Sequence, residues 1–331
     1  MSIEKEIWKT ITSARCILIT SHERVDGDGV GSELALMLMA RGVGVECVVI
    51  NDEAISEEYG FLPGAEEIHK ISDGRQDEFD LVVSLDSASM ERLRKVKDRL
   101  PKGVKIINID HHISNTLYGD INWVGHEASS TGEMIFNLAE ANGIAITPEI
   151  ATCLYTAIIT DTGRFCYSNT SSQTHLAAAE LVRRGASPSE ISRRIYRAER
   201  SNVLRLRQLA LATLELSADG QIACIDVAAE MHRKTGTEYQ DTHDFVDMPK
   251  SIKGVEVALL FREIAEDGKT RVSMRSEGRI DMNAVAQKFG GGGHKRAAGC
   301  TIDGSIEHAH KGVLPVVEKL LETQRQNEKE Q

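Results

Sequence analysis

Aspartates and histidines gather at three points in the first half of this 331-residue chain, each directly after a short apolar run. The runs are residues 16–20, 81–85 and 105–109, and the clusters after them are Ser21-His22 with Asp26-Gly27-Asp28, then Asp86, then Asp110-His111-His112. Taken singly, each cluster has an ordinary structural explanation as a turn, a loop residue or a helix cap. Their joint occurrence after successive apolar runs favours one shared chemical site.

Carboxylates mixed with imidazoles are typical ligands of a divalent ion of intermediate hardness, such as manganese or magnesium, with cobalt also suitable. Asp161 is a further candidate, because it ends an apolar helical stretch, where the helix dipole disfavours a carboxylate. Five or more such ligands are too many for one ion. Two ions about 3.5 to 4 Å apart, bridged by one carboxylate, form the arrangement that serves in-line displacement at phosphorus. We therefore expect a two-metal centre that activates water and neutralises phosphoryl oxygens.

The elements that must position these residues follow a βαβ pattern, in which apolar runs rich in β-branched residues alternate with amphipathic segments. Predicted strands cover residues 16–20, 45–50, 81–85 and 105–109, and predicted helices cover 30–41, 131–142 and 148–160. Ser129-Ser130-Thr131 is interpreted most simply as the N-cap of one of these helices and left outside the site, although hydroxyls near a phosphate site are the alternative. In a doubly wound parallel sheet, ligands bind beyond the carboxyl ends of the strands. The three clusters should therefore meet in one crevice.

The remainder of the chain is predicted to form a smaller α/β domain, since a single core stops growing at about 250 to 300 residues. Its predicted strands are residues 221–226, 254–263 and 271–276, and its predicted helix is 283–289. A long polar segment before it has Arg and Leu at helical spacing, which suits a connector between domains. We expect a metal-binding domain at 1–187, a connector helix at 188–215 and a substrate-binding domain at 216–331.

Glycines 290 to 293, followed by His294, form a second candidate site. Successive glycines let backbone N–H groups approach an anion closely, and a neighbouring histidine or arginine adds charge. Residues 250–300 carry ten Lys and Arg against six Asp and Glu, which favours phosphate binding. The candidates are Gly291, Gly292, Gly293, His294, Arg262 and Arg275. A hinge or helix cap followed by surface bases, with solvated arginines, remains the alternative.

The whole chain is acidic, with 39 Lys and Arg against 50 Asp and Glu and a net charge of −11. This charge opposes binding to long duplex DNA, for which phosphate neutralisation dominates affinity. The expected partner is therefore short RNA or a small nucleotide. The sequence leaves the oligomeric state open, with a homodimer among the options.

Apolar runs in the chain are far shorter than the roughly 20 residues that cross a bilayer, and the N-terminus lacks a signal-peptide pattern. We therefore expect no membrane partner and a cytoplasmic location. The six cysteines form no Cys-x-x-Cys pair, which indicates neither a zinc knuckle nor a disulfide framework.

Beyond these physical arguments, residues 21–32, Ser-His-Glu-Arg-Val-Asp-Gly-Asp-Gly-Val-Gly-Ser, together with Asp110-His111-His112 resemble the DHH phosphoesterase superfamily. Its four signature motifs have counterparts in order, at residues 22–32, Asp86, 110–112 and Asp161. Residues 290–299, Gly-Gly-Gly-Gly-His-Lys-Arg-Ala-Ala-Gly, resemble the signature of the DHH-associated domain. One departure is Val25, which stands where the family usually has proline and should loosen the loop slightly.

The resemblance implies a role for each candidate residue. One ion would take His22, Asp26 and the bridging Asp86, and the other would take Asp28, Asp86, His111 and Asp161. Asp110 would orient His111, and His112 would face the substrate phosphate and assist protonation of the leaving group. Arg262, Arg275, the glycine loop and His294 would hold the nucleotide end across a cleft between the two domains.

Within the superfamily, the length and two-domain layout are similar to the NrnA-like group, and two divalent ions, manganese foremost, are implied. This implies hydrolysis of short oligoribonucleotides, linear dinucleotides or 3'-phosphoadenosine 5'-phosphate (pAp) to mononucleotides. The length leaves no room for the extra domains of a RecJ-like exonuclease. The alternatives are a cyclic-di-AMP phosphodiesterase, an inorganic pyrophosphatase, whose family lacks the glycine-rich histidine motif, or a non-catalytic nucleotide-binding regulator.

Overall fold

The computed structural model describes residues 2–74, 78–196, 200–242, 244–264 and 268–329. The chain folds as two compact units, Met1–Ala198 and Glu199–Gln331. Within the described residues, no helix combines the length and the apolar character that crossing a membrane requires.

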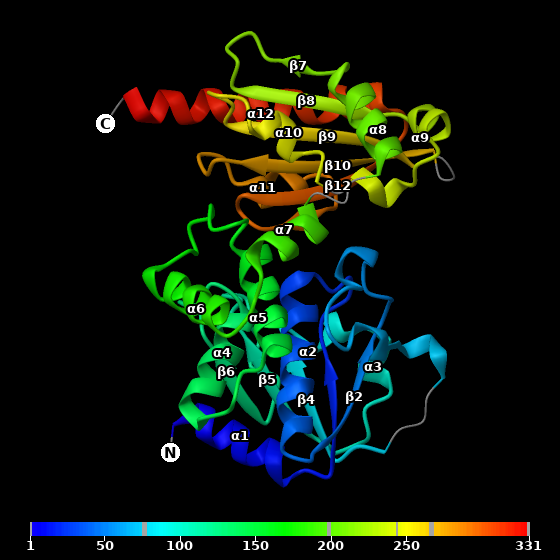
Figure 1. Ribbon diagram of the computed structural model, residues 1–331. Coiled ribbons are helices and arrows are strands. Elements are labelled where there is room, and N and C mark those ends of the chain that lie inside the picture. Colours follow the sequence, from blue (N-terminus) through cyan, green and yellow to red (C-terminus); the bar gives the residue numbers. More distant parts are fainter. Residues whose placement is uncertain (1, 75–77, 197–199, 243, 265–267, 330–331) are drawn as a thin grey trace. The chain divides into compact units, whose positions relative to one another are not determined.

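The first unit is built on a six-stranded parallel sheet in the order β3-β2-β1-β4-β5-β6 (Figure 1). Its strands are β1 Cys16–Thr20, β2 Glu46–Asn51, β3 Ile68–Lys70, β4 Leu81–Leu85, β5 Lys105–Asp110 and β6 Ile121–Val124. Its helices are α1 Ile3–Ser13, α2 Gly27–Gly42, α3 Lys95–Asp98, α4 Thr131–Asn142, α5 Pro148–Asp161, α6 Ser172–Arg183 and α7 Pro188–Tyr196. Short 3-10 turns lie at Glu57–Tyr59, Ala65–Glu67, Ile71–Asp73 and Met90–Leu93. The predicted parallel sheet is confirmed.

Both faces of this sheet are buried, as the period of two in a strand requires. Ile17 and Ile19 of β1 point into a core shared with α1, α2, α4 and α5, whereas Leu18 points into a smaller core with Leu93 and Val96. Helix α2 packs closely on α5. A Cβ atom at Gly31 would lie only 2.5 Å from the carbonyl oxygen of Cys153, so glycine there permits the close approach.

The second unit has a mixed six-stranded sheet in the order β11-β12-β10-β9-β8-β7, in which only β8 and β9 run parallel among the described strand pairs. Its strands are β7 Glu215–Leu216, β8 Ile222–Val227, β9 Val257–Ile264, β10 Lys269–Ser276, β11 Gly292–Gly293 and β12 Ala297–Asp303. Its helices are α8 Ser201–Leu211, α9 Ala229–Thr235, α10 Asp247–Lys250, α11 Met282–Gln287 and α12 Ile306–Lys329, with a 3-10 turn at Tyr239–Thr242. Helices α11 and α12 cover one face and α8 covers the other (Figure 1).

The single connector helix predicted at 188–215 is wrong. Helix α7 ends at Tyr196, Arg200 has an extended backbone (φ −71°, ψ 137°), α8 starts at Ser201, and strand β7 already begins at Glu215. Residues 197–199 lie outside the described residues. The physical reason is that the two helices bury their apolar residues in different cores, Ile191 in the first unit and Leu206 in the second. The division between the two compact units falls between Ala198 and Glu199, inside the segment predicted as the connector.

Candidate metal centre

The order of strands brings the three predicted clusters to one place in the first unit. The sheet order changes direction between β1 and β4, and in such sheets the ligand crevice lies beyond the carboxyl ends of the strands at that point. Asp26 follows β1 as the N-cap of α2, and its Oδ1 accepts hydrogen bonds from the N–H groups of Asp28 and Gly29. Asp86 directly follows β4, and His111 directly follows β5.

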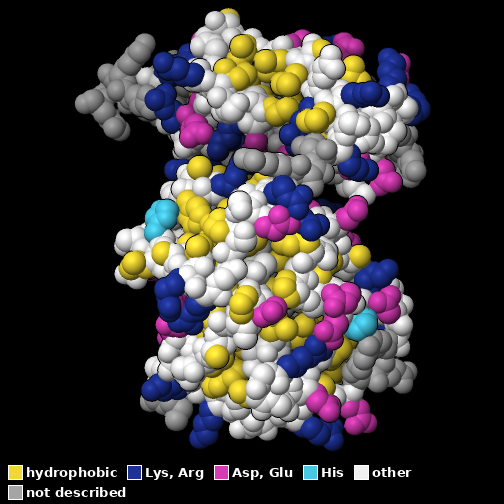
Figure 2. Space-filling view, viewed as in Figure 1, with side chains coloured by type: hydrophobic (Ala, Val, Ile, Leu, Met, Phe, Trp, Pro, Cys, Tyr) yellow, Lys and Arg dark blue, Asp and Glu magenta, His cyan; other side chains and the backbone are white. Residues whose placement is uncertain are grey.

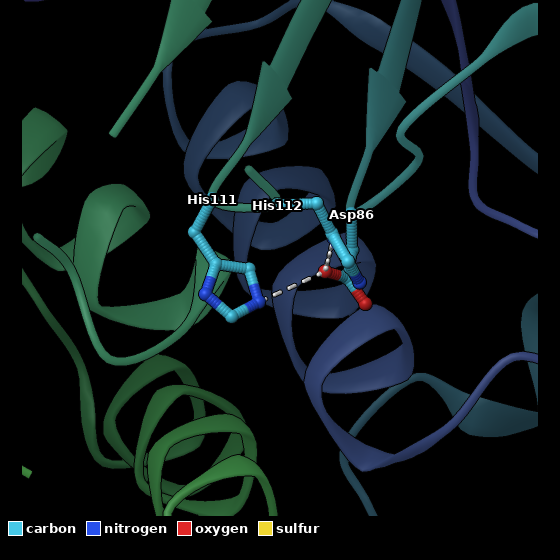
Figure 3. Close-up of side chains that lie close together, drawn as sticks. All are labelled: Asp86, His111 and His112. Atoms are coloured by element: carbon cyan, nitrogen blue, oxygen red, sulfur yellow. Dashed lines mark ion pairs between the residues drawn. The ribbon is translucent and has the colours of Figure 1, made fainter. Parts of the chain in front are cut away.

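Asp86 lies between two histidines from different strand ends. Its Oδ2 is 3.4 Å from His22 Nε2, and its Oδ1 is 3.6 Å from His111 Nε2. Figure 3 shows His111 and His112 reaching from the end of β5 toward the Asp86 carboxylate. One carboxylate therefore presents its two oxygens to two different imidazoles, which is the arrangement a bridging ligand requires.

The six predicted ligands form two groups in which one ligand atom of each residue lies within 4.8 Å of the others. These groups are His22 with Asp26 and Asp86, and Asp28 with His111 and Asp161. In the second group, His111 Nε2 lies 3.8 Å from Asp28 Oδ2 and 3.6 Å from Asp161 Oδ2. The structure thus brings together all six residues, while their role as metal ligands stays a prediction.

The start of helix α4 holds the Asp28 carboxylate. The backbone N–H groups of Thr131 and Gly132 donate to its two oxygens at 2.7 and 2.8 Å, and Ser32 Oγ donates at 3.2 Å. The Thr131 hydroxyl donates to Asp86 Oδ1 at 3.1 Å. Ser130 is the N-cap, as predicted, but placing Thr131 outside the site is wrong, because its backbone and hydroxyl contact two of the candidate ligands.

The backbone of Asp86 is itself held in an unusual conformation. Its φ of 52° lies in the left-handed region, which costs energy for a residue with a side chain. The surrounding structure maintains this conformation through an N–H bond to the Ile109 carbonyl at 3.0 Å. Such strain is concentrated at functional sites, and here it turns the carboxylate at the end of β4 toward the histidines.

The centre concentrates negative charge away from water. Asp28 and Asp86 are 1 % and 2 % exposed, and within the described part of the chain their ion-pair partners are histidine rings. Burial raises the pKa of Asp28 to about 7, with Asp161 adding to the effect, and raises the pKa of Asp161 to about 6. Burial and the carboxylates of Asp28 and Asp26 also raise the pKa of Asp86. A divalent cation would reverse these shifts, so the donor set fits metal binding.

The same surroundings that favour the neutral carboxylic acids favour the charged form of His111, which lies between them. Burial disfavours the charged ring of His111, but Asp28, Asp86 and Asp161 outweigh burial and raise its pKa to about 9. In the absence of a metal, the protonated ring is therefore the cation that partly balances the site.

The predicted contact between Asp110 and His111 is wrong, because Asp110 holds His112 instead. Asp110 Oδ1 lies 2.7 Å from His112 Nδ1, and Asn115 Nδ2 donates to the other oxygen at 2.6 Å. The reason is that the His111 ring is turned toward Asp28 and Asp161, at 3.8 and 3.6 Å from its Nε2, although both histidine rings also lie 3.6 Å from Asp86 Oδ1. Burial opposes ionisation of Asp110, but the bonds from His112 and Asn115 outweigh it and lower its pKa. His112 Nδ1 is thereby fixed, and Nε2 is the nitrogen available for proton exchange.

Three further side chains around the centre were not identified from the sequence. Asn169 Nδ2 donates to Asp161 Oδ2 at 3.2 Å and to the Asp161 carbonyl at 3.1 Å. Glu33, fully buried, accepts from Asn51 Nδ2 at 2.9 Å, and Asn51 Oδ1 accepts from the N–H of Ser21 beside His22. Burial raises the pKa of Glu33 to about 8. A sequence offers little signal for these residues, since each is a single polar residue outside any recognisable motif.

In the second unit, the two predicted arginines lie on neighbouring antiparallel strands. Arg262 of β9 is only 8 % exposed, lies 4.6 Å from the Tyr239 ring centroid, and donates to Thr242 Oγ1 and Ser273 Oγ at 3.2 and 3.0 Å. Arg275 of β10 donates to the Met274 carbonyl at 3.2 Å. Arg262 is therefore a fixed, largely buried cation, whereas Arg275 is more exposed.

The glycine run is partly a strand. Gly292 and Gly293 form β11 and pair with Gly299 and Ala298, and a turn closed by the N–H of His294 and the carbonyl of Ala297 connects them to β12. A Cβ at Gly291 would lie 2.2 Å from the Gly299 carbonyl oxygen, so close strand packing alone explains that glycine. His294 is exposed on this turn, and anion binding here stays a prediction.

The sequence matches two family descriptions that together span most of the chain. "DHH family, N-terminal domain" matches residues 16–158, and "DHHA1 domain" matches residues 220–323. Two curated relatives carry the name "Bifunctional oligoribonuclease and PAP phosphatase NrnA". The one from Bacillus subtilis is 31 % identical over 91 % of this chain and 93 % of its own length, and the one from Thermus thermophilus is 32 % identical over 97 % and 94 %.

Solved structures share this fold. An exopolyphosphatase-related protein from Bacteroides fragilis is similar over 98 % of this chain and 97 % of its own, with a TM-score of 0.92 and 29 % identity. RecJ from Thermus thermophilus, solved in complex with Mn²⁺, matches with a TM-score of 0.54 and 13 % identity over 98 % of this chain and 54 % of its own. The second likeness concerns the fold alone.

Proposed function

The chain belongs to the DHH family, and from this membership we propose that it is a metal-dependent phosphoesterase that hydrolyses short oligoribonucleotides and pAp to mononucleotides. The names of the two curated relatives support this activity, and each similarity extends over more than nine-tenths of both chains. The proposed substrates include linear dinucleotides, which are the shortest oligoribonucleotides with an internucleotide phosphodiester bond.

The observation that carries the proposal is the position of Asp86. Its two oxygens face His22 and His111, each of which belongs to a separate three-residue group of potential ligands. Such a carboxylate is suited to bridge two divalent ions, and two bridged ions are the usual means of hydrolysing a phosphate ester. We propose His22, Asp26 and Asp86 as ligands of one ion, and Asp28, Asp86, His111 and Asp161 as ligands of the other.

When bound, the ions would activate the attacking water and neutralise the phosphoryl oxygens. The protein's own contribution is to hold the ligands in place before substrate arrives, through the α4 N–H groups on Asp28 and through Asn169 on Asp161. His112, with Nδ1 fixed by Asp110, is the proposed proton donor to the leaving oxygen.

For the substrate, we propose that the second unit supplies anion-binding groups. The buried guanidinium of Arg262 and the half-buried one of Arg275 are suited to phosphate oxygens, because charged donors form the strongest hydrogen bonds to them. Exposed His294 and the backbone of Gly292 would add further donors. These residues, rather than the metal ligands, would select among nucleotide substrates.

A single enzyme preparation assayed on a panel of substrates tests the proposal. We expect Mn²⁺-loaded protein to release mononucleotides from pAp, pApA and five-nucleotide RNA, with activity lost on chelation and in Asp86→Asn. Hydrolysis of pyrophosphate or cyclic-di-AMP alone would contradict the proposed substrates. Tight pAp binding without turnover under Mn²⁺, Mg²⁺ or Co²⁺ would instead favour a regulatory protein.

Manganese is the proposed native metal, since carboxylates with imidazoles suit it and no thiolate is among the proposed ligands. A homodimer and a cytoplasmic location are the accompanying proposals. Metal analysis of protein purified without added metal, light scattering and cell fractionation test these three points separately.

A further inference from the structure

Three potential ligands of different chemistry meet on one face of the second unit's sheet, outside the residues assigned above. They are Glu215 on β7, Cys224 on β8 and His310 on α12, and one ligand atom of each lies within 4.8 Å of the other two. Cys224 is 4 % exposed, the His310 side chain is 17 % exposed, and Glu215 is exposed. The thiol thus lies at the base of the group and the carboxylate at its rim.

Strand register and the period of the sheet explain why they meet. Glu215 pairs directly with Cys224 across the antiparallel β7–β8 ladder, so their side chains share a face. Alternate residues of β8 face the two sides of the sheet, and Cys224 lies on the side that packs against Ala309 and Val313 of α12. His310 follows Ala309 on that helix.

The His310 ring is held in a fixed position. Its Nε2 lies 2.8 Å from Asp226 Oδ1, and its centroid lies 4.0 Å from that of Phe261. Asp226 is two residues from Cys224 on the same face of β8, so it adds a further oxygen donor beside the group. Carboxylate partners of this kind orient metal-bound histidines.

The local charges oppose a free thiolate and favour a cation. Burial raises the pKa of Cys224 to about 12, and the carboxylates of Asp226 and Glu215 add to the effect. A divalent ion would reverse the balance, because a coordinating thiol loses its proton on binding.

We propose that Glu215, Cys224 and His310, supported by Asp226, form a Zn²⁺ site in the second unit. A thiolate, an imidazole and a carboxylate are each ordinary zinc ligands, whereas Mn²⁺ and Mg²⁺ prefer oxygen donors. On binding, the Cys224 thiol releases its proton to water and the thiolate coordinates the ion. The site would fasten the two-residue strand β7 to β8 and α12 at the sheet edge.

Cobalt provides a direct probe, because a thiolate ligand gives Co²⁺ a charge-transfer absorption in the near ultraviolet that oxygen and imidazole ligands do not. The six proposed ligands of the first unit include no cysteine, so this absorption reports on the new site. In the full, chelator-treated chain we expect the band to saturate after no more than three equivalents of Co²⁺, since the two proposed sites of the first unit also take up the ion, and to disappear when Zn²⁺ is added. It should persist in Asp86→Asn.

Matched cysteine variants complete the test. Cys224→Ser should abolish the band, whereas Cys300→Ser, which alters another buried cysteine of the same unit on β12, should retain it. Glu215→Gln, at an exposed position where folding is not at risk, should lower zinc affinity by at least tenfold. No thiolate band at several equivalents of Co²⁺, or an equal band in Cys224→Ser, would overturn the proposal.

Discussion

At the scale of single residues, the proposed metal ligands are held in place by groups that are not themselves proposed to bind metal. A strained backbone and the Thr131 hydroxyl position the Asp86 carboxylate so that each of its oxygens faces a different histidine. Two backbone N–H groups hold the Asp28 carboxylate. Such outer contacts commonly contribute about 10- to 100-fold to metal affinity or activity.

Asp110→Asn tests which histidine Asp110 serves. Because Asp110 contacts His112 and not His111, we expect kcat to fall by about 10- to 100-fold while two metal ions remain bound. Steady-state kinetics and metal analysis on the same sample measure both quantities. A loss of metal with unchanged kcat per loaded centre would show that Asp110 supports the ligand His111 after all.

Thr131→Val tests the contribution of the α4 N-terminus. It removes the hydroxyl that donates to Asp86 while keeping the volume, so Mn²⁺ affinity should fall by roughly tenfold. Thr152→Val is the matched control, since its hydroxyl bonds only the Pro148 carbonyl at the far end of α5 from Asp161. Calorimetric titrations that found equal affinities in the two variants would count against this role.

The pH dependence of metal affinity follows from the raised pKa values of the carboxylates. A metal ion binds the deprotonated forms, and without metal Asp28 and Asp161 have pKa values of about 7 and 6, while His111 has one of about 9. Protons therefore compete increasingly as the pH falls, and Mn²⁺ affinity should rise from pH 6 to 8 by about tenfold per pH unit for each proton displaced. Titrations in buffers of different ionisation enthalpy measure the protons released. A flat affinity over this range would contradict the assigned ligands.

At the scale of elements, the close contact of α2 with α5 brings two of the proposed ligands together, since Asp28 lies in the first turn of one helix and Asp161 ends the other. Gly31→Ala places a methyl group 2.5 Å from the Cys153 carbonyl oxygen, and overpacking of this kind costs about 1 to 3 kcal/mol. Gly42→Ala, in the same helix with open space around it, should be neutral or stabilising. Denaturant unfolding of the two variants measures the difference, and equal stability would show that α2 and α5 can separate without cost.

Regular elements with a strong pattern were the predictable part of the fold. The strand at residues 81–85 was located without error because it is an isolated apolar run, buried on both faces. The segment 188–215 was not, since helical spacing cannot show that Ile191 and Leu206 face two different cores.

The site divides in the same way. Strand ends indicated which acids and histidines would meet, because topology alone brings those ends together. Contacts between residues far apart in sequence left no such signal, as with Thr131 on Asp28 or His310 beside Cys224. The sequence also could not show that Asp110 contacts His112 and not His111, because this depends on which way each side chain points at the end of β5.

At the scale of the whole molecule, the chain combines a net charge of −11 with a locally basic segment in its second unit. Figure 2 shows acidic and basic side chains intermingled on the visible face. A surface of this kind gives little non-specific attraction for long nucleic acids. We propose that individual groups such as Arg262 and His294 make the selection. The division of labour proposed here assigns the reaction to one compact unit and substrate selection to the other.

The most direct test of this account is electron paramagnetic resonance of the protein loaded with two equivalents of Mn²⁺. If Asp86 bridges two ions, the wild-type spectrum should be that of an exchange-coupled pair, and Asp86→Asn should show uncoupled ions and lose activity by on the order of a thousandfold. Asp98→Asn, at an exposed position on α3, should match the wild type. An uncoupled wild-type spectrum, or a coupled one that survives in Asp86→Asn, would contradict the two-metal centre.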